Sequence, residues 1–164
     1  MLDPATRHAL DQALDDEYKA RATYQVVLDR FGPVRPFVRI VQAEERHAQA
    51  EERHAQALIG QYRRHGLQPP DDRWSGQVQA PATLEEACEA GVAGEIDNQA
   101  LYERLLAEVS DPQVAAIMRR LQEASAQRHL PAFRRCLARG GAGRGGPSGG
   151  PGGGPRLRHH GGPR

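Results

Sequence analysis

Residues 43–57 read AEERHAQAEERHAQA, so a seven-residue unit occurs twice, and each copy contains the spacing Glu-x-x-His. The two pairs are Glu44 with His47 and Glu51 with His54. Residues three apart on an α-helix share a face, so each pair can offer a carboxylate and an imidazole to one metal ion. The same spacing is a ligand motif of metal-binding helical bundles. Glu and His are also common on helix surfaces, so the motif needs support from the rest of the chain.

Capping and helix-breaking residues divide the chain into helices. Asp3, which precedes a proline, is typical of a helix start. Thr83 begins a Thr-x-x-Glu capping box that includes Glu86. Gly32 and Gly66 stand where helices are expected to stop. The sequence therefore predicts helices over residues 4–30, 36–65, 84–109 and 112–139, the last with a kink at Pro131.

The connections between these helices indicate the fold class. No stretch alternates as a β-strand does, so the predicted class is all-α. The first and last connections are short, and each therefore predicts an antiparallel helical hairpin. The proline-rich connection over residues 67–82 is long enough to run the length of a bundle. Two antiparallel helical hairpins joined by a long crossover form a ferritin-like four-helix bundle.

Composition excludes several classes of function. The net charge of +1 and the lack of a basic, aromatic-rich stretch argue against nucleic acid as a partner. No apolar run approaches the roughly 20 residues of a membrane span, and the N-terminus resembles neither a signal nor a transit peptide. We therefore predict a cytoplasmic protein without membrane contact. We expect a bundle domain over residues 1–139 and a disordered Gly/Pro/Arg-rich tail over residues 140–164.

The apolar stripes of the helices carry polar residues in matching positions. The first helix has Glu17 and, seven residues later, Tyr24, while the third has Glu95 followed by Tyr102 at the same spacing. In the second helix, the four Glu and His residues of the duplicated heptad lie in the apolar stripe. Ionised groups there are costly unless they are paired or metal-bound. The two hairpins thus repeat one plan, with carboxylates directed inward.

Heights along the bundle agree with this plan. Glu17 lies fifteen residues before the first turn and His47 fifteen after it, so they should face each other. In the second hairpin, Glu95 lies sixteen residues before Asp111 and His129 eighteen after it. These positions predict a metal site near the middle of the bundle, with the ligands Glu17, Glu44, His47, Glu95 and His129.

One ligand position is not filled. Ala126 stands three residues before His129, so the last helix lacks a Glu-x-x-His pair. Ser125 shares the predicted inward face but is a poor ligand for a hard cation. Asn98, three residues after Glu95, could ligate through its carbonyl oxygen or hold a water. A lopsided or single-metal site is therefore an alternative to a two-metal site.

Only one copy of the heptad is needed for this site. Seven residues turn a helix by nearly two full turns, so both copies face inward. We predict that the first copy fills the site, because the short first turn fixes its height. Glu51 and His54 would then overhang towards Gly66, near Leu10 and Leu14, and they are kept as alternative ligands.

The two cysteines follow the same spacing. Cys88 lies seven residues before Glu95 and Cys136 seven after His129, so both should point inward at similar height. They are interpreted as small core residues. The alternative is a redox-active thiol pair that exchanges electrons with the metal site.

Several stretches together resemble a known family. ALDDEYKARATYQVVLDRFG, AEERHAQAL, LEEACEAGVAGEIDNQALYERLL and LQEASAQRHLPAFRRCL resemble the DUF2202 ferritin-like family, relatives of rubrerythrin. The resemblance covers about Leu10 to Arg139. It implies a four-helix bundle with a non-haem iron site, and position by position it favours the same five ligands. The duplicated heptad departs from the family pattern, which is expected to have one Glu-x-x-His here.

The functional prediction is a non-haem iron protein, with manganese as the alternative metal. It would carry out oxidoreductase chemistry on dioxygen or peroxide at one or two metal ions. Tyr24 and Tyr102 are the candidate catalytic residues, as hydrogen-bond partners of the ligands or electron donors, or else as packing residues. No Cys-x-x-Cys pair is present, so electrons would come from a separate electron donor or the thiol pair. The alternative is a non-enzymatic metal-binding or structural bundle, and a homodimer is expected.

Overall fold

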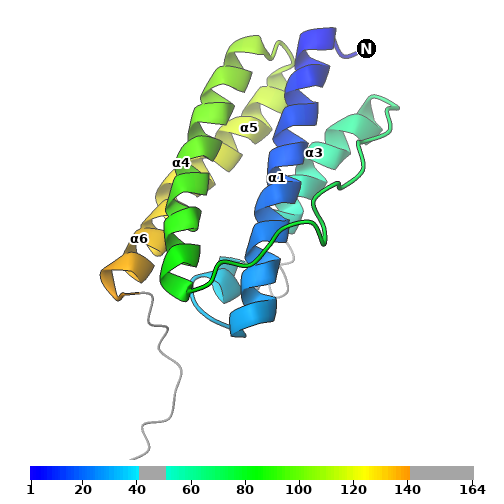
Figure 1. Ribbon diagram of the computed structural model, residues 1–164. Helices are drawn as coiled ribbons and strands as arrows, with labels where there is room; N and C mark the ends of the chain where they lie inside the picture. Colours follow the sequence, from blue (N-terminus) through cyan, green and yellow to red (C-terminus); the bar gives the residue numbers. More distant parts are fainter. Residues whose placement is uncertain (41–50, 141–164) are drawn as a thin grey trace, which may run out of the picture.

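The computed structural model describes residues 1–40 and 51–140, without the side chains of residues 51–53. This part of the chain is all-helical and contains no β-strand (Figure 1). The all-α class predicted from the sequence is therefore confirmed. The elements are α1 (Pro4–Phe31), α3 (Glu51–Arg64), α4 (Leu84–Glu108), α5 (Pro112–Ala124), the π-helix η1 (Ser125–His129) and α6 (Leu130–Ala138). They form a helical bundle in which α1 packs on α3 and α4, and α4 packs on α5, η1 and α6.

The ends of α1 follow from its capping residues. The Asp3 carboxylate accepts a hydrogen bond of 2.9 Å from the backbone N–H of Thr6, which satisfies one of the free N–H groups of the first turn. Gly32 ends the helix with φ at +77°, and its N–H donates to the carbonyl of Leu28 at 2.8 Å. This conformation suits glycine because residues with a Cβ rarely adopt it. Both predicted ends of the first helix are confirmed.

The caps of α4 and α5 also match the sequence, with one difference. The Thr83 hydroxyl accepts from the backbone N–H of Glu86 at 3.1 Å. The Glu86 carboxylate reaches back to the N–H of Ala82 at 3.1 Å, one residue further than in an ordinary capping box. Asp111 caps α5 by accepting from the N–H groups of Gln113 and Val114.

The last predicted helix is interrupted by a π-turn. The backbone N–H of Leu130 donates to the carbonyl of Ser125, five residues earlier. Pro131, which follows directly, has no N–H to donate, and its ring crowds the preceding turn. A π-turn inserts one extra residue into an α-helix and so rotates the faces on either side of it. The irregularity expected at Pro131 is therefore present as the π-helix η1, placed just before the proline.

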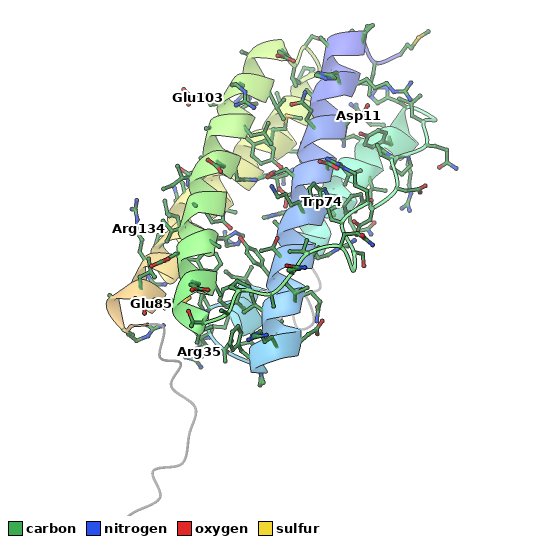
Figure 2. The ribbon with its side chains drawn as sticks, in the orientation of Figure 1. Asp11, Arg35, Trp74, Glu85, Glu103 and Arg134 are labelled. Carbon is green, nitrogen blue, oxygen red and sulfur yellow. A yellow bond between two sulfur atoms is a disulfide. The ribbon has the colours of Figure 1, made fainter. Side chains whose placement is uncertain are left out.

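The connection between α3 and α4 lies along the bundle as predicted (Figure 1). Arg73 forms two hydrogen bonds to the Asp15 carboxylate, at 2.7 and 2.8 Å. The indole N–H of Trp74 donates to the same carboxylate at 3.1 Å, so Trp74 lies against α1 (Figure 2). Arg21 donates to Asp72 at 3.0 Å. These contacts hold the non-helical crossover against the exposed face of α1.

Two clusters of buried side chains form the core, one on each side of the polar residues. The first surrounds Leu14, Leu58 and Met118, and the second surrounds Phe37 and Phe133. Gly91 allows close packing in the second cluster, because a Cβ there would come within 2.5 Å of the Phe133 ring. No helix in residues 1–40 and 51–140 is long and apolar enough to cross a membrane.

Both ends of the second predicted helix are anchored to the bundle. At one end, the rings of Phe37 and Tyr24 lie 5.8 Å apart. At the other, the Tyr62 hydroxyl donates to Asp11 at 2.5 Å, and Arg64 pairs with Asp111 at 2.8 Å. These contacts set the height of α3 from its Gly66 end. The predicted position of the surplus heptad concerns residues 41–50, which lie outside the described part of the chain.

Candidate metal site

A buried carboxylate on α1 forms the first half of the candidate site. Glu17 is only 5% exposed. It accepts a hydrogen bond of 2.6 Å from the Tyr102 hydroxyl on α4. Its other carboxylate oxygen lies 3.8 Å from Nδ1 of His54 on α3. The carboxylate is thus held from two sides, by a neutral hydroxyl and by an imidazole.

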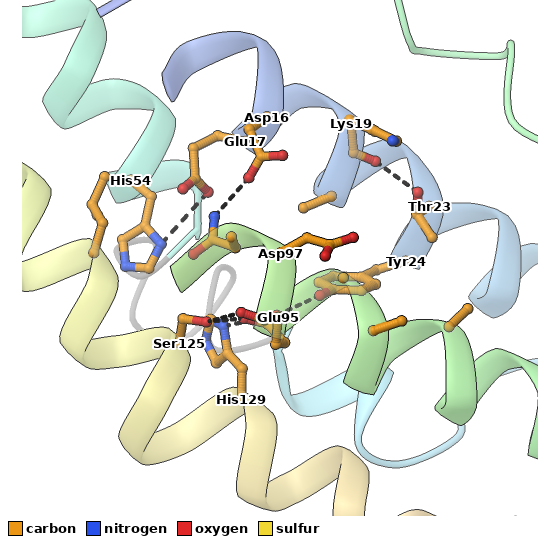
Figure 3. A pocket seen from close by; sticks show the side chains of 16 residues that line it. Asp16, Glu17, Lys19, Thr23, Tyr24, His54, Glu95, Asp97, Ser125 and His129 are labelled. Atoms are coloured by element: carbon orange, nitrogen blue, oxygen red, sulfur yellow. Dashed lines mark hydrogen bonds and ion pairs between the residues drawn. The ribbon is translucent and has the colours of Figure 1, made fainter. Parts of the chain in front are cut away.

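The second half repeats this arrangement on the other hairpin (Figure 3). Glu95 on α4 is 5% exposed and accepts a hydrogen bond of 2.5 Å from the Tyr24 hydroxyl on α1. The Ser125 hydroxyl donates to its other oxygen at 2.5 Å. Nδ1 of His129 lies 3.4 Å from the carboxylate. The spacing of Glu and Tyr by seven residues on each helix lets each tyrosine reach the carboxylate of the opposite hairpin.

All four of these acidic and imidazole side chains line one cavity. It has a volume of about 330 Å³ and lies between α1, α3, α4 and η1. The rings of His54 and His129 are 6.1 Å apart between their centres. In the described part of the chain, however, no group of three or more His, Cys, Asp or Glu side chains is close enough to hold a metal ion. The donors instead form two carboxylate–imidazole pairs that face the same space.

Of the two histidines in the duplicated heptad, His54 in the second copy lies in the described part of the chain. His54 lies beside Glu17 and across from His129. The physical reason is the anchoring of α3 through Tyr62 and Arg64, which sets the height of His54 from the Gly66 end. Glu44 and His47 lie outside the described residues, as does the side chain of Glu51. Of the favoured ligands, the structure brings together Glu17, Glu95 and His129.

Ser125, and not Ala126, shares the buried face with His129. Residues three and four positions apart share a face of a helix, and of these two candidates Ala126 is exposed. Ser125, four positions before His129, is 2% exposed and bonds to Glu95. The inward direction predicted for Ser125 is therefore confirmed, and its hydroxyl contacts Glu95 where the last helix lacks a carboxylate.

A further carboxyl group lies at the mouth of the cavity. Asp16 accepts a hydrogen bond of 2.6 Å from the Asn98 side chain, and both residues line the cavity. Burial raises the pKa of Asp16 to about 6, and the neighbouring Glu17 and Glu95 act in the same direction. Asn98, considered above as an alternative ligand, uses its amide N–H to hold Asp16. Neither the role of Asp16 nor its contact with Asn98 was predicted from the sequence.

The two cysteines form a disulfide. Cys88 on α4 and Cys136 on α6 are joined, with their Cα atoms 6.2 Å apart. Both are almost fully buried in the same cluster as Tyr24 and Phe133. Their predicted inward direction and common height are confirmed. The bond ties α6 to α4 one heptad away from Glu95 and His129.

Comparison with known proteins gives no further assignment. No family model, no curated protein and no solved structure matches the chain. The resemblance to the DUF2202 family stays a prediction from the sequence stretches quoted above.

Proposed function

We propose that this chain is a ferritin-like protein that binds iron, with manganese as the alternative metal. The proposal includes oxidoreductase chemistry on dioxygen or peroxide at one or two metal ions. The observation that carries it is the placement of Glu17, Glu95, His54 and His129 around one cavity. They come from α1, α4, α3 and η1, so residues far apart in the sequence supply the donors.

The donor set fits the chemistry of these metals. Carboxylate and imidazole are the ligands that iron and manganese share in proteins. Two buried carboxylates and two imidazoles around a cavity are costly to the fold without compensation. The structure supplies partial compensation through the Glu17–His54 and Glu95–His129 pairs. A cation in the cavity would compensate both carboxylates at once, which is the physical argument for metal binding.

The surrounding residues would hold these donors in place. Tyr102 donates to one oxygen of Glu17, which leaves the other oxygen, 3.8 Å from His54, for a metal. Tyr24 and Ser125 donate to the two oxygens of Glu95, and His129 lies 3.4 Å from the oxygen that Tyr24 contacts. Ser125 restrains Glu95 further. Bound iron would supply one-electron chemistry, which the carboxylates and imidazoles of the site lack. Tyrosine hydroxyls at hydrogen-bond distance from ligands are also suitably placed to deliver a proton or an electron, which makes Tyr24 and Tyr102 the proposed catalytic residues.

One observation favours the alternative, a bundle in which these groups are structural. In the described part of the chain, each buried carboxylate already has a tyrosine and a histidine partner without any metal. A purely structural polar core would show the same pairs. Metal content separates the two proposals, because both leave the fold unchanged.

The direct test is metal content after anaerobic addition of ferrous iron and removal of unbound metal. We expect one or two irons per chain, a higher melting temperature, and iron-dependent consumption of dioxygen or peroxide. Glu17→Ala, Glu95→Ala and His129→Ala should each lower iron content and the gain in melting temperature. His8→Ala is the matched control, since His8 is exposed on α1 and outside the cavity. Full iron content in all three site variants would refute the site, and the absence of bound iron in the wild type would favour the structural bundle.

A further inference from the structure

A second cavity lies on the other side of His129 and has a different character. It has a volume of about 290 Å³ and lies between residues 35–40 on one side and η1 and α6 on the other. Ten residues of the described part of the chain line it; none of these is an Asp or a Glu, and five are arginines: Arg35, Arg39, Arg128, Arg135 and Arg139. The remaining lining is mostly small or apolar. This groove, called the arginine groove below, is a concentration of positive charge in a chain whose net charge is only +1.

The positions of the arginines follow from helical spacing. Arg128, Arg135 and Arg139 are seven and four residues apart, which places them on one stripe of η1 and α6. Arg35 lies in the turn before the helical residues 37–40 and Arg39 lies within them, and the two form a second stripe along the groove. The cavity lies between the two stripes, so guanidinium groups face it from both sides. Ala132, between the arginines of α6, leaves room where a larger side chain would fill the groove.

These charges are not used by the described fold. Within residues 1–40 and 51–140, none of the five guanidinium groups takes part in a side-chain hydrogen bond or an ion pair. By contrast, Arg21, Arg64 and Arg73 all pair with aspartates. All five arginine side chains are exposed, and their like charges repel one another across the groove. An anion in the groove would offset this repulsion.

We propose that the arginine groove binds a compact, multiply charged phosphate anion of the diphosphate class. Guanidinium groups are planar forks that bind phosphate oxygens through two parallel hydrogen bonds. The volume lies at the lower limit of small-molecule sites, which suits a diphosphate and excludes a larger ligand within the groove. Among the described residues that line the groove there is no Phe, Tyr or Trp, which are the usual stacking residues of a nucleic-acid site. The proposal does not depend on a metal, because none of the five arginines is a metal ligand.

The test uses full-length protein from which metal has been removed with a chelator, so that phosphate cannot bind through iron. Inorganic pyrophosphate is titrated calorimetrically at low and at physiological salt. We expect saturable binding that weakens with salt, because the contacts are charge-assisted and exposed. The paired substitution Arg39→Gln with Arg135→Gln removes one guanidinium from each stripe. It should weaken pyrophosphate binding by at least about tenfold, since each fork supplies strong hydrogen bonds.

The matched control is the pair Arg104→Gln with Arg134→Gln. Both arginines are exposed, on α4 and α6, and neither lines the groove (Arg134 is labelled in Figure 2). This variant has the same net charge as the test variant and keeps the tail of residues 141–164. Pyrophosphate affinity close to wild type in the control, with tenfold loss in the test variant, supports the groove. Equal affinity in both variants would overturn it, as would an absence of binding to the wild type.

A single-stranded oligonucleotide is the second probe. The compact-anion proposal expects it to bind no more tightly than pyrophosphate, with little difference between the two paired variants. Tighter binding to the wild type that is lost in Arg39→Gln with Arg135→Gln would overturn the diphosphate assignment. The melting temperature of each variant without ligand shows that loss of binding is not loss of fold.

Discussion

The Tyr102 hydroxyl on α4 donates a hydrogen bond of 2.6 Å to the Glu17 carboxylate on α1. The reverse contact, from Tyr24 on α1 to Glu95 on α4, has the same form. Each of the two helices therefore donates a tyrosine hydroxyl to the buried carboxylate of the other helix. This exchange couples the stability of the bundle to the position of the candidate ligands.

Tyr102→Phe should lower both stability and metal binding. It removes the hydroxyl from a buried carboxylate, which should cost about 1–3 kcal/mol of the free energy of unfolding. Denaturant unfolding measures the first effect, and iron titration measures the second. Tyr62→Phe is the control, because Tyr62 bonds to Asp11 outside the cavity. It should lower stability without lowering iron affinity. If both variants bind iron like the wild type, the tyrosine does not position a ligand.

Deletion of residues 43–49, one complete heptad, should preserve the site. The anchors Phe37 and Tyr62 contact positions on α1 that are thirteen residues apart, Tyr24 and Asp11. Thirteen helical residues span about 20 Å, whereas the 25 residues from Phe37 to Tyr62 would span about 37 Å as a straight helix. The deletion shortens this stretch by about 10 Å. We expect an equal or higher melting temperature and unchanged iron content.

The comparison of His54→Ala with His47→Ala tests which copy of the heptad supplies a histidine to the site. His54 contacts Glu17 and the ring of His129 lies nearby, so His54→Ala should reduce iron content more than His47→Ala. Elemental analysis of both proteins after identical iron loading decides between them. A greater loss in His47→Ala would return the site to the first copy of the heptad.

Gly91→Ala should destabilise the bundle. The new Cβ would lie 2.5 Å from the Phe133 ring, and that ring is held by Tyr24 and Phe37 at 5.4 and 5.2 Å. Overpacking of this kind costs about 1–3 kcal/mol. Gly94→Ala on the same helix is the control, because nothing lies within 4 Å of its Cβ. It should be neutral or stabilising by up to about 1 kcal/mol, since alanine favours helix. Thermal unfolding should show a lower melting temperature for Gly91→Ala and an unchanged or higher one for Gly94→Ala.

Stability should depend on pH through Asp16. Its folded pKa of about 6 lies above the value of 3.8 for an unperturbed aspartate. The folded state therefore binds a proton more tightly than the unfolded state. The resulting stability is fully present below pH 3.8 and is lost as the pH rises through 6. The size is about 3 kcal/mol at most, since the group keeps some contact with solvent. Asp16→Asn should remove this fall in stability between pH 4 and 7.

Asp15, Asp72 and Asp111 act in the opposite direction and give a check on that experiment. Hydrogen bonds and arginine partners hold the pKa of each below its ordinary value. They contribute stability above pH 4 that is lost as the pH falls through their folded pKa values. The Asp16→Asn variant should still lose stability at low pH through these three aspartates. If the free energy of unfolding of Asp16→Asn falls between pH 4 and 7 as much as that of the wild type, Asp16 does not cause the fall.

Reduction of the Cys88–Cys136 disulfide should lower stability. The bond closes a loop with a sequence separation of 48 residues, and the chain-entropy relation gives about 4 kcal/mol for a loop of this length. Melting with and without a reductant measures the effect. Cys88→Ser with Cys136→Ser is the control, because its melting temperature should not respond to the reductant. A wild-type protein with equal melting temperatures in both conditions would contradict the prediction.

The sequence by itself determined the helices, their ends and the inward residues of regular segments. Asp3, Gly32 and Thr83 act through contacts within a few residues, so local spacing was enough to predict them. The apolar stripe likewise identified Glu17, Glu95 and His129, because burial on a regular helix follows its period. The common height of Cys88 and Cys136 came from the same arithmetic.

The tertiary structure decided what depends on contacts between distant segments. The π-turn before Pro131 and the hydrogen bond from Ser125 to Glu95 were not predicted, because helical spacing assumes a regular helix and does not give side-chain partners. Both heptad copies have the same phase, so the position of His54 beside Glu17 was set by the anchoring of Tyr62 on α1. The arginine groove also needs two helical segments that only the fold brings together. Periodicity fixes which face of a helix is buried, while the height and pairing of that face are fixed by packing against other helices.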